Sequence, residues 1–411
     1  MTASPLLNRF LRYVRIHTTA DENTTAYPSS PGQLVLGKLL VDELRAMGIE
    51  DAHQDEHGLV YATVPGTVEH PAPVVAFNAH VDTSPETSGE NVQPQVIESY
   101  EGGDIVLPGD SSQVIRVSEN ADLEPLKGAT LITTDGTTLL GGDDKAGIAI
   151  IMQLAEHLMA NSEIPHGPIR ILYTCDEDLG RGVDHVDFEK LGADVCYTLD
   201  GPGANDIDTE TFSADLATVT IRGVNIHPSI AKDRMVNAIR GAGEFIARLP
   251  KDSLAPEVTD GRDGFMHPYV IEGLVAEVRL KIILRDFETS GLEDQAQRLR
   301  AIAKEVAADM PGLEIDVDAR AQYRNMRDGL LNEPRAVDYA VEAHRRLGRQ
   351  PNLAIIRGGT DGSQLTERGL PTPNLSSGQH NPHSPLEWAC LDEMQQAVEV
   401  LIELVQIWAE R

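Results

Sequence analysis

The sequence has few cysteines, few aromatic residues and little positive charge. Only three cysteines occur in 411 residues, Cys175, Cys196 and Cys390. This odd, widely spaced set fits neither a disulfide framework nor a CxxC metal knuckle. Because free thiols persist in reducing compartments, we expect a cytoplasmic location.

Positive charge is scarce, since 34 Lys and Arg stand against 65 Asp and Glu, a formal net charge of −31. This balance argues against nucleic acid or an anionic membrane as a partner. No apolar stretch reaches transmembrane length. Arginines interrupt the apolar residues of the N-terminal MTASPLLNRFLRYVRIHTT, which is typical of an amphipathic helix rather than a signal peptide. The excess of acids does supply oxygen ligands for divalent cations.

The chain is too long for one compact core, and its pattern of predicted helices and strands changes twice. Before residue 209 short apolar strands alternate with helices, which predicts an α/β domain with a largely parallel sheet. The β-α-β-β-α-β order of residues 209–324 predicts a ferredoxin-like α+β insert. Residues 325–411 return to the alternation of strands and helices seen before residue 209. We therefore expect one catalytic domain, 1–208 and 325–411, interrupted by a lid-like insert.

The stretch TTLLGGDDKAG, residues 137–147, places two glycines and two aspartates before the apolar run 148–158. That run is long enough for a buried helix, and Asp143 or Asp144 can cap it. On this interpretation Asp143 is only an N-cap. The alternative is a metal-binding carboxylate, which gains weight because histidines and carboxylates also follow other predicted strands.

His80 and Asp82 follow the predicted strand 73–80, and ligand sites of open α/β sheets gather at the carboxyl ends of strands. A histidine there can bind zinc while an aspartate two residues on orients it. The alternative is an ordinary turn containing both residues.

Acidic residues end two further predicted strands, with Asp176, Glu177 and Asp178 after 169–174 and Asp200 after 194–199. Adjacent carboxylates can divide the work, one coordinating a metal while its neighbour holds the attacking water as general base. The alternatives are a solvated acidic turn and, for Asp200, the first position of a Gly-Pro turn.

The segment GQHNPHSPLEW, residues 378–388, follows the turn-rich PTPNLSS and adds His380 and His383. Either could be a second imidazole ligand, and spacing does not choose between them. Two histidines with three or four carboxylates suit a pair of zinc ions, or cobalt or manganese substitutes. Two dications about 4 Å apart need a bridging carboxylate. At the start of a helix facing the strand ends, Asp143 is placed to bridge.

Together these motifs resemble the peptidase T family, tripeptide aminopeptidases within the dizinc carboxypeptidase G2/aminoacylase-like metallopeptidases. The resemblance covers nearly the whole chain, and its motifs occur in the family's order: HVDTSP, TTLLGGDDKAGIA, DEDLGRG, YTLDGP, NIHPSIAK, RGGTDGSQL and HSPLEW. It implies two Zn²⁺ per subunit, a small peptide substrate, and a cytoplasmic homodimer whose insert serves as lid and dimerisation domain.

The resemblance also implies residue roles. The metal ligands would be His80, Asp143, Asp178, Asp200 and His383. Asp143 would bridge, Asp82 would orient His80, and Glu177 would be the general base for a metal-bridging water. Substrate contacts would come from Asn225, His227, Arg285 and Arg357. Of these, His227 would stabilise an oxyanion and the arginines would bind a peptide carboxylate. A loop histidine and structural ion pairs are the alternatives for these three. A cis Asp143–Asp144 peptide bond is implied as well.

The chain departs from the family pattern in three places. Asp178 stands where a glutamate is usual, which shortens that ligand by one methylene. Gly142 stands where alanine is usual. Near His383, aromatic and basic residues are replaced by Pro382, Pro385 and Leu386. The resulting hypothesis is a tripeptide aminopeptidase. Its alternatives are a dipeptidase or N-acyl-amino-acid deacylase on the same scaffold and a non-catalytic metal-binding protein.

Overall fold

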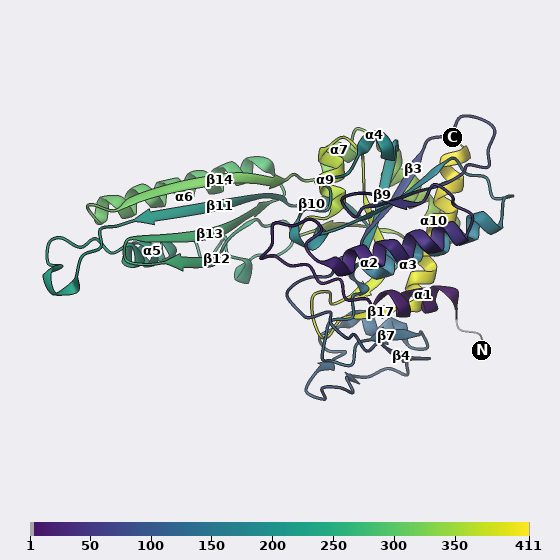
Figure 1. Ribbon diagram of the computed structural model, residues 1–411, viewed down its shortest axis with the longest axis horizontal. Coiled ribbons are helices and arrows are strands. Elements are labelled where there is room, and N and C mark those ends of the chain that lie inside the picture. The colour runs from purple at the N-terminus through teal and green to yellow at the C-terminus, as the bar shows by residue number, and fades with distance from the viewer. Residues whose placement is uncertain (1–3, 411) are drawn as a thin grey trace. The chain divides into compact units, whose positions relative to one another are not determined.

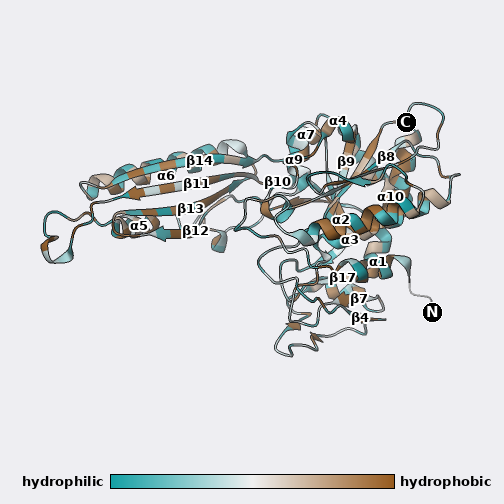
Figure 2. Ribbon diagram, in the orientation of Figure 1, coloured by the Kyte–Doolittle hydropathy of each residue, from teal (hydrophilic) through white to brown (hydrophobic). Residues whose placement is uncertain are grey.

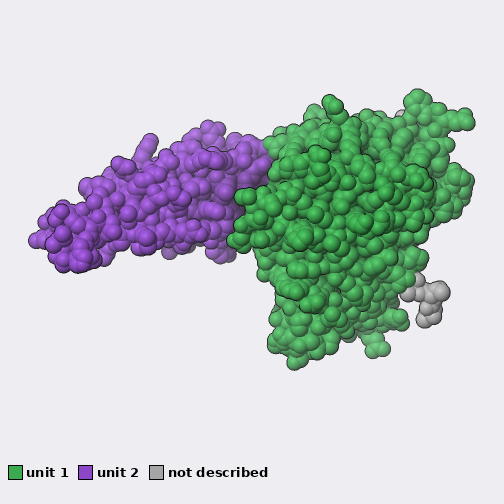
Figure 3. All heavy atoms as spheres, viewed as in Figure 1, with its two compact units in different colours: residues 1–209, 326–354, 360–411 green, residues 210–325, 355–359 purple. Residues whose placement is uncertain are grey.

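Figure 1 shows the computed structural model of the protein, which describes residues 4–410. The chain divides into two compact units (Figure 3). The first contains the residues up to Thr209, Met326–Ala354 and the residues from Thr360 on. The second contains Glu210–Asn325 and Ile355–Gly359. Part of the amphipathic helix expected in the N-terminal MTASPLLNRFLRYVRIHTT falls on positions 1–3, outside the described residues.

The first unit is built on a mixed sheet, 11-stranded over the described residues, with the order β1-β2-β8-β3-β9-β16-β17-β7-β4. Strand β10 also pairs with β16, and β15 pairs with β10. The strands are β1 His53–Gln54, β2 Val60–Val64, β3 Val75–His80, β4 Gln95–Ile97, β7 Leu131–Thr133, β8 Ile169–Thr174, β9 Val195–Pro202, β10 Asp206–Thr211, β15 Asn352–Ile356, β16 Asn374–His380 and β17 Trp388–Cys390. Strands β8, β3, β9 and β16 are parallel neighbours. Their carboxyl ends therefore meet at one edge of the sheet, which is where the functional side chains collect.

Helices cover this sheet and bury their apolar faces against it. They are α1 Pro5–Tyr13, α2 Pro31–Ala46, α3 Gly142–Ala160, α4 Phe188–Leu191, α7 Arg327–Leu330, α8 Arg335–Arg346, α9 Asp361–Glu367 and α10 Leu391–Glu410. Helix α3 is apolar almost all round, and Ile148, Ile150 and Ile151 are fully buried. A helix of that kind belongs inside a core. It joins Phe77 of β3 and Trp408 of α10 in the main apolar cluster.

The long irregular segment between β3 and α3 has a small core of its own. It contains β5 Ile105–Val106, β6 Val114–Ile115 and the short 3₁₀ helix η1 Ala121–Leu126. Tyr100, Leu107 and Leu123 pack there against Trp388 of β17. This packing fixes the segment to the strand that precedes α10.

The second unit is an antiparallel sheet of β11 Ser213–Arg222, β12 Phe265–Gly273, β13 Glu277–Asp286 and β14 Glu314–Tyr323, in the order β12-β13-β11-β14. Its helices are α5 Ala238–Ala247 and α6 Thr289–Asp309, with 3₁₀ turns η3 Pro228–Ile230 and η4 Pro256–Val258. Alternate residues Ala217, Val219 and Ile221 of β11 point into the apolar cluster under the helices, and the alternation is visible along the strands in Figure 2.

The predicted fold class is confirmed, since an α/β domain is interrupted by an antiparallel α+β insert. The interpretation of PTPNLSS as a turn is wrong over its second half, because Asn374–His380 forms strand β16. Among the described residues, no helix is both long and apolar enough to cross a membrane.

Candidate metal centre

The groups singled out in the sequence converge at the carboxyl edge of the first unit's sheet. His80 ends β3 and Asp200 lies in β9. The 3₁₀ turn η2, Glu177–Leu179, follows β8. Asp143 lies at the start of α3, and His383 follows β16. Asp143 brings these groups together.

Each carboxylate oxygen of Asp143 faces a different histidine. Its Oδ1 lies 2.8 Å from His80 Nε2, and its Oδ2 lies 3.1 Å from His383 Nε2. Asp143 has non-helical dihedral angles, and the Asp143–Asp144 peptide bond is cis. The capping role falls to Asp144 instead, whose Oδ1 accepts a hydrogen bond from Gly147 N at 3.2 Å. Asp143 is thus not an N-cap.

Two donor groups share Asp143 and could each hold a cation. One is His80, Asp143 and Asp200, and the other is Asp143, Asp178 and His383. Within each group the ligand atoms lie within 4.8 Å of one another. Asp178 Oδ1 is 3.0 Å from His383 Nε2, and its Oδ2 is buried with no hydrogen-bond partner. These nitrogen and oxygen donors, with one buried oxygen unused, fit a pair of divalent cations for which Asp143 would be a shared ligand.

A third donor group joins Asp82 to His80 and Asp178, but the oxygens of Asp82 are already engaged. Its Oδ1 accepts from Glu177 N at 3.0 Å, and its Oδ2 accepts from Asp178 N at 3.1 Å. The same Oδ1 lies 3.4 Å from His80 Nδ1. Asp82 therefore holds the η2 turn, which sequence reasoning did not predict. Its role in orienting His80 stays a prediction, because His80 Nδ1 has no hydrogen-bond partner.

Glu387 holds the backbone that carries Asp143. It is 1% exposed, and its Oε2 accepts from Leu140 N at 2.7 Å and Gly141 N at 2.8 Å. Its Oε1 accepts from Asp143 N at 3.0 Å. The sequence showed this glutamate only as part of HSPLEW, so its role in shaping the TTLLGGDDKAG loop was missed.

Asp176 anchors the start of the η2 turn. It is fully buried with a positive φ of 58°. Its Oδ2 accepts from Ser29 N at 2.8 Å and Arg181 Nη2 at 2.7 Å, and its Oδ1 accepts from Ser29 Oγ and Gln33 Nε2. This charge-assisted network ties the turn that carries Glu177 to the start of α2. In the sequence, the only indication of this network was the acidic run that contains Asp176.

Electrostatics at the centre favour bound cations. Burial raises the pKa of Asp178 to about 6, and burial raises the pKa of Glu177 and Asp200 well above the usual range. Burial acts the same way on Asp143, but the hydrogen bonds of His383 and His80 outweigh it and lower the pKa of Asp143. Several carboxylates share one buried space, and positive charge there would offset their mutual repulsion.

The two C-terminal histidines separate clearly. His380 is buried, stacks on Trp388 with ring centroids 3.7 Å apart, and has its Nε2 2.7 Å from Glu393 Oε2. It fixes β16 to the start of α10. His383 faces Asp143, and its Nδ1 lies 3.3 Å from Glu86 Oε2.

The predicted substrate residues lie in the second unit, and the contacts described for them are with other residues of that unit. Asn225 and His227 are exposed, and His227 Nδ1 lies 2.7 Å from Ser229 Oγ. Arg285 donates to backbone oxygens and to an amide oxygen, and Arg357 donates to carbonyls and a hydroxyl. These bonds end on neutral oxygens, so they are not ion pairs. The roles of these four residues toward substrate stay predictions.

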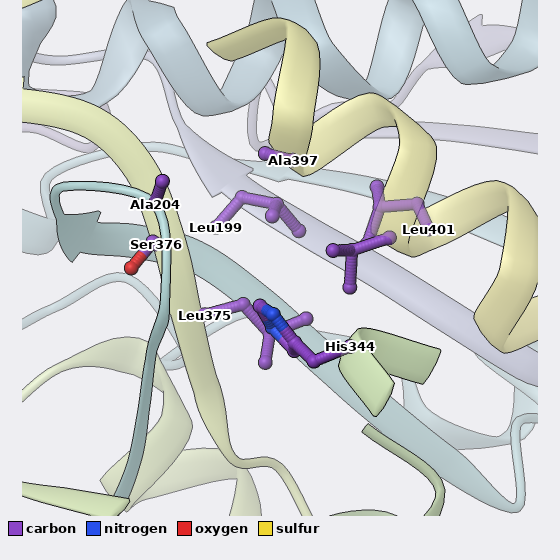
Figure 4. Close-up of a pocket in the computed structure, with 8 residues that line it drawn as sticks. Leu199, Ala204, His344, Leu375, Ser376, Ala397 and Leu401 are labelled. Carbon is purple, nitrogen blue, oxygen red and sulfur yellow. The ribbon is translucent and has the colours of Figure 1, made fainter. Parts of the chain in front are cut away.

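A small cavity lies between β9, β16, α8 and α10. It is lined mainly by apolar residues that include Leu199, Leu375 and Leu401 (Figure 4). Its volume of about 10 Å³ leaves room for at most a single water. His344 lines it and is 2% exposed, and its Nδ1 has no hydrogen-bond partner. The cavity is too small for a peptide and bears on stability rather than on substrate.

Comparison with known proteins adds sequence evidence. Residues 209–312 match the family model described as the peptidase dimerisation domain. The chain is 43% identical to peptidase T of Geobacillus kaustophilus, covering 99% of this chain and 98% of that protein. It is 42% identical to peptidase T of Bacillus subtilis, covering 98% of each.

Solved structures share the fold. A tripeptidase from Staphylococcus aureus superposes with a TM-score of 0.76 at 24% identity, covering 99% of this chain and 98% of that one. The YXEP protein of Bacillus subtilis, a dinuclear metal-binding peptidase of the M20 family, superposes with a TM-score of 0.64 at 17% identity, covering 98% of each chain.

Proposed function

Because this chain belongs to the peptidase T family of the M20 peptidases, we propose that it is a dimetal aminopeptidase that removes the N-terminal residue from tripeptides. One observation carries the proposal, namely that the two oxygens of Asp143 face His80 and His383 separately. A carboxylate placed between two imidazoles in this way suits a bridging ligand in a two-metal hydrolase.

Two divalent cations are the implied cofactors, zinc first, with cobalt or manganese as substitutes. His80, Asp143 and Asp200 would hold one, and Asp143, Asp178 and His383 would hold the other. When bound, such a pair supplies Lewis acidity toward a carbonyl oxygen and makes water more acidic. Asp82 would contribute by orienting the ring of His80, and it accepts a hydrogen bond from the backbone of Glu177.

Glu177 is the proposed general base. It lies beside the ligand Asp178 on a turn whose backbone Asp82 holds. Burial raises its pKa well above the usual carboxyl range, although the nearby His80 acts in the opposite direction. A base with a raised pKa can take the proton of the attacking water and return it to the leaving amine near neutral pH.

The insert, proposed as residues 209–324, would serve as lid and dimerisation domain of a homodimer, supported by its match to the peptidase dimerisation domain. Asn225, His227 and Arg285 of the insert, together with Arg357 outside it, are the proposed substrate contacts, with the arginines suited to the peptide carboxylate. Three buried free cysteines are compatible with a reducing, cytoplasmic location.

The test is a panel of dipeptides, tripeptides and N-acylated amino acids assayed with the zinc-loaded protein. We expect tripeptides to be cleaved fastest, with release of the N-terminal residue. Preferential cleavage of acylated substrates, or no turnover at all, would contradict the proposal.

The variant Glu177→Gln tests the base. It should lower kcat by about 10²–10⁴-fold, the usual contribution of a positioned base, while metal content stays unchanged. Glu189→Gln is the matched control, because Glu189 is exposed on the surface of α4. Equal kcat in the two variants would remove Glu177 from the mechanism.

A further inference from the structure

Gln379 of β16 clamps the metal-ligand candidate Asp200. Its side chain is buried, and Nε2 donates to Asp200 Oδ1 at 2.9 Å and to the carbonyl oxygen of Asp200 at 3.0 Å. Both acceptors can only receive a hydrogen bond, so the NH₂ end of the amide must face them. One amide thus binds the main chain and the carboxylate of the same residue.

The clamp follows from strand pairing. Strands β16 and β9 run parallel, with Gln379 opposite Pro202 and irregular register around Ser376. The same strand also reaches the other side of Asp200, because Asn374 Oδ1 accepts from Asp200 N at 2.9 Å. Strand β16 therefore fixes the backbone of Asp200 at its N–H and its carbonyl, and Gln379 alone extends that hold to the carboxylate.

The oxygen that Gln379 holds is the one directed toward the metal centre. Asp200 Oδ1 lies 4.0 Å from His80 Nε2, and Asp200 forms one donor group with His80 and Asp143. A hydrogen bond from a neutral amide restricts the rotation of a carboxylate and favours its ionised form. Hydrogen bonds of this kind orient metal ligands and raise the affinity of a site.

We infer that Gln379 is a positioning residue for Asp200, which it holds in the orientation needed to bind the cation shared with His80 and Asp143. The inference deepens the proposed function and rests on it. Gln379 would act through Asp200 and would not touch substrate. Its loss should therefore affect one of the two cation positions and leave the one formed by Asp178 and His383 in place.

The test compares Gln379→Met with the wild-type protein. Methionine keeps the unbranched length of glutamine and removes the donor. Gln379→Glu keeps the shape of the side chain and places a second carboxylate against the carbonyl oxygen and Oδ1 of Asp200. Gln406→Met is the matched control, because Gln406 Nε2 donates to the carbonyl of Ile402 within α10. Thermal unfolding of each metal-free protein shows whether the variants fold.

Zn²⁺ dissociation constants are then measured by competition with a chelator, and visible spectra are recorded with Co²⁺ as a probe. Gln379→Met should weaken one of two Zn²⁺ by about 10–100-fold, the typical effect of removing such a partner. Gln379→Glu should weaken the same cation at least as much. In both variants the Co²⁺ spectrum of one position should change while the other keeps its bands, and Gln406→Met should match the wild type in every measurement.

Two Zn²⁺ bound as tightly by both Gln379 variants as by the wild type would overturn the inference and leave the proposed function intact. If Gln379→Met does not fold, the Gln379→Glu variant alone decides between the same two outcomes. A wild-type protein that binds no pair of Zn²⁺ would overturn the proposed function, and the positioning role with it.

Discussion

Replacing Asp82 by asparagine is the perturbation whose effect can be worked out most fully from the structure. The two oxygens of Asp82 accept the N–H groups of Glu177 and Asp178, and one of them also lies 3.4 Å from His80 Nδ1. Asparagine has one oxygen and one NH₂ group. In either orientation of the amide, one backbone N–H of the η2 turn meets a donor instead of an acceptor.

The expected magnitude follows from the bonds that are lost. A hydrogen bond to a charged group contributes about 1.5–3 kcal/mol, and leaving a buried N–H unpaired costs about 1–3 kcal/mol more. A total of about 3–5 kcal/mol corresponds to about 10²–10⁴-fold in kcat/KM at 1.36 kcal/mol per decade. This conversion applies when Asp82 stabilises only the conformation of the turn that is active in catalysis. The loss should fall mainly on kcat, because the displaced group is the base Glu177.

The assay measures kcat and KM for one tripeptide at saturating zinc, with thermal unfolding as a check on folding. Asp194→Asn is the matched control. Asp194 Oδ2 also accepts a backbone N–H, that of Val74 at 2.8 Å, but it precedes β9 instead of following a strand. A loss in Asp82→Asn no greater than in Asp194→Asn would refute the reasoning.

Two further predictions concern stability. Burial lowers the pKa of His344 to about 4 from its usual value near 6.5, so the unfolded chain binds a proton that the folded chain refuses, and stability is lost as pH falls through this window. At 1.36 kcal/mol per pH unit the loss reaches about 3 kcal/mol. In urea unfolding, His344→Leu should therefore gain stability over the wild type as pH falls from 6.5 to 4, and parallel curves would contradict this. Ser29→Ala removes the buried hydroxyl donor to Asp176 and should cost about 1.5–3 kcal/mol in the free energy of unfolding. Ser112→Ala, which removes the exposed hydroxyl donor to Asp110, should cost almost nothing, and equal effects of the two would argue against the anchor.

The sequence predicted elements where burial left a simple apolar pattern. Strand β8 runs over Ile169–Thr174, as the apolar run IRILYT predicts. Strand β16 was missed because its residues are polar, although it lies between β9 and β17 and is buried throughout. Its polar groups are satisfied by the neighbouring chain, as when Ser377 Oγ donates to the carbonyl of Gly201. Hydropathy cannot detect a buried strand of this kind.

The sequence singled out residues that the structure brings together at the candidate site, but it did not predict their geometry. Strand ends placed His80 and Asp200 near one another, because parallel strands share an edge. Spacing could not separate His380 from His383. That choice depends on the backbone of the loop, where His383 has a φ of 62° and His380 ends a strand. The supporting contacts of Asp176 and Glu387 join segments far apart in the chain, and no local pattern encodes them.

The central claim is that Asp143 bridges two cations, and metal stoichiometry tests it most directly. Zinc content and affinity are measured for the wild type, Asp178→Asn and Asp143→Asn, each checked for folding in the metal-free form. We expect two Zn²⁺ per chain in the wild type and one tightly bound Zn²⁺ in Asp178→Asn. Asp143→Asn, which lacks the shared ligand, should bind neither tightly. An Asp143→Asn protein that keeps both cations, or loses only one, would contradict the account.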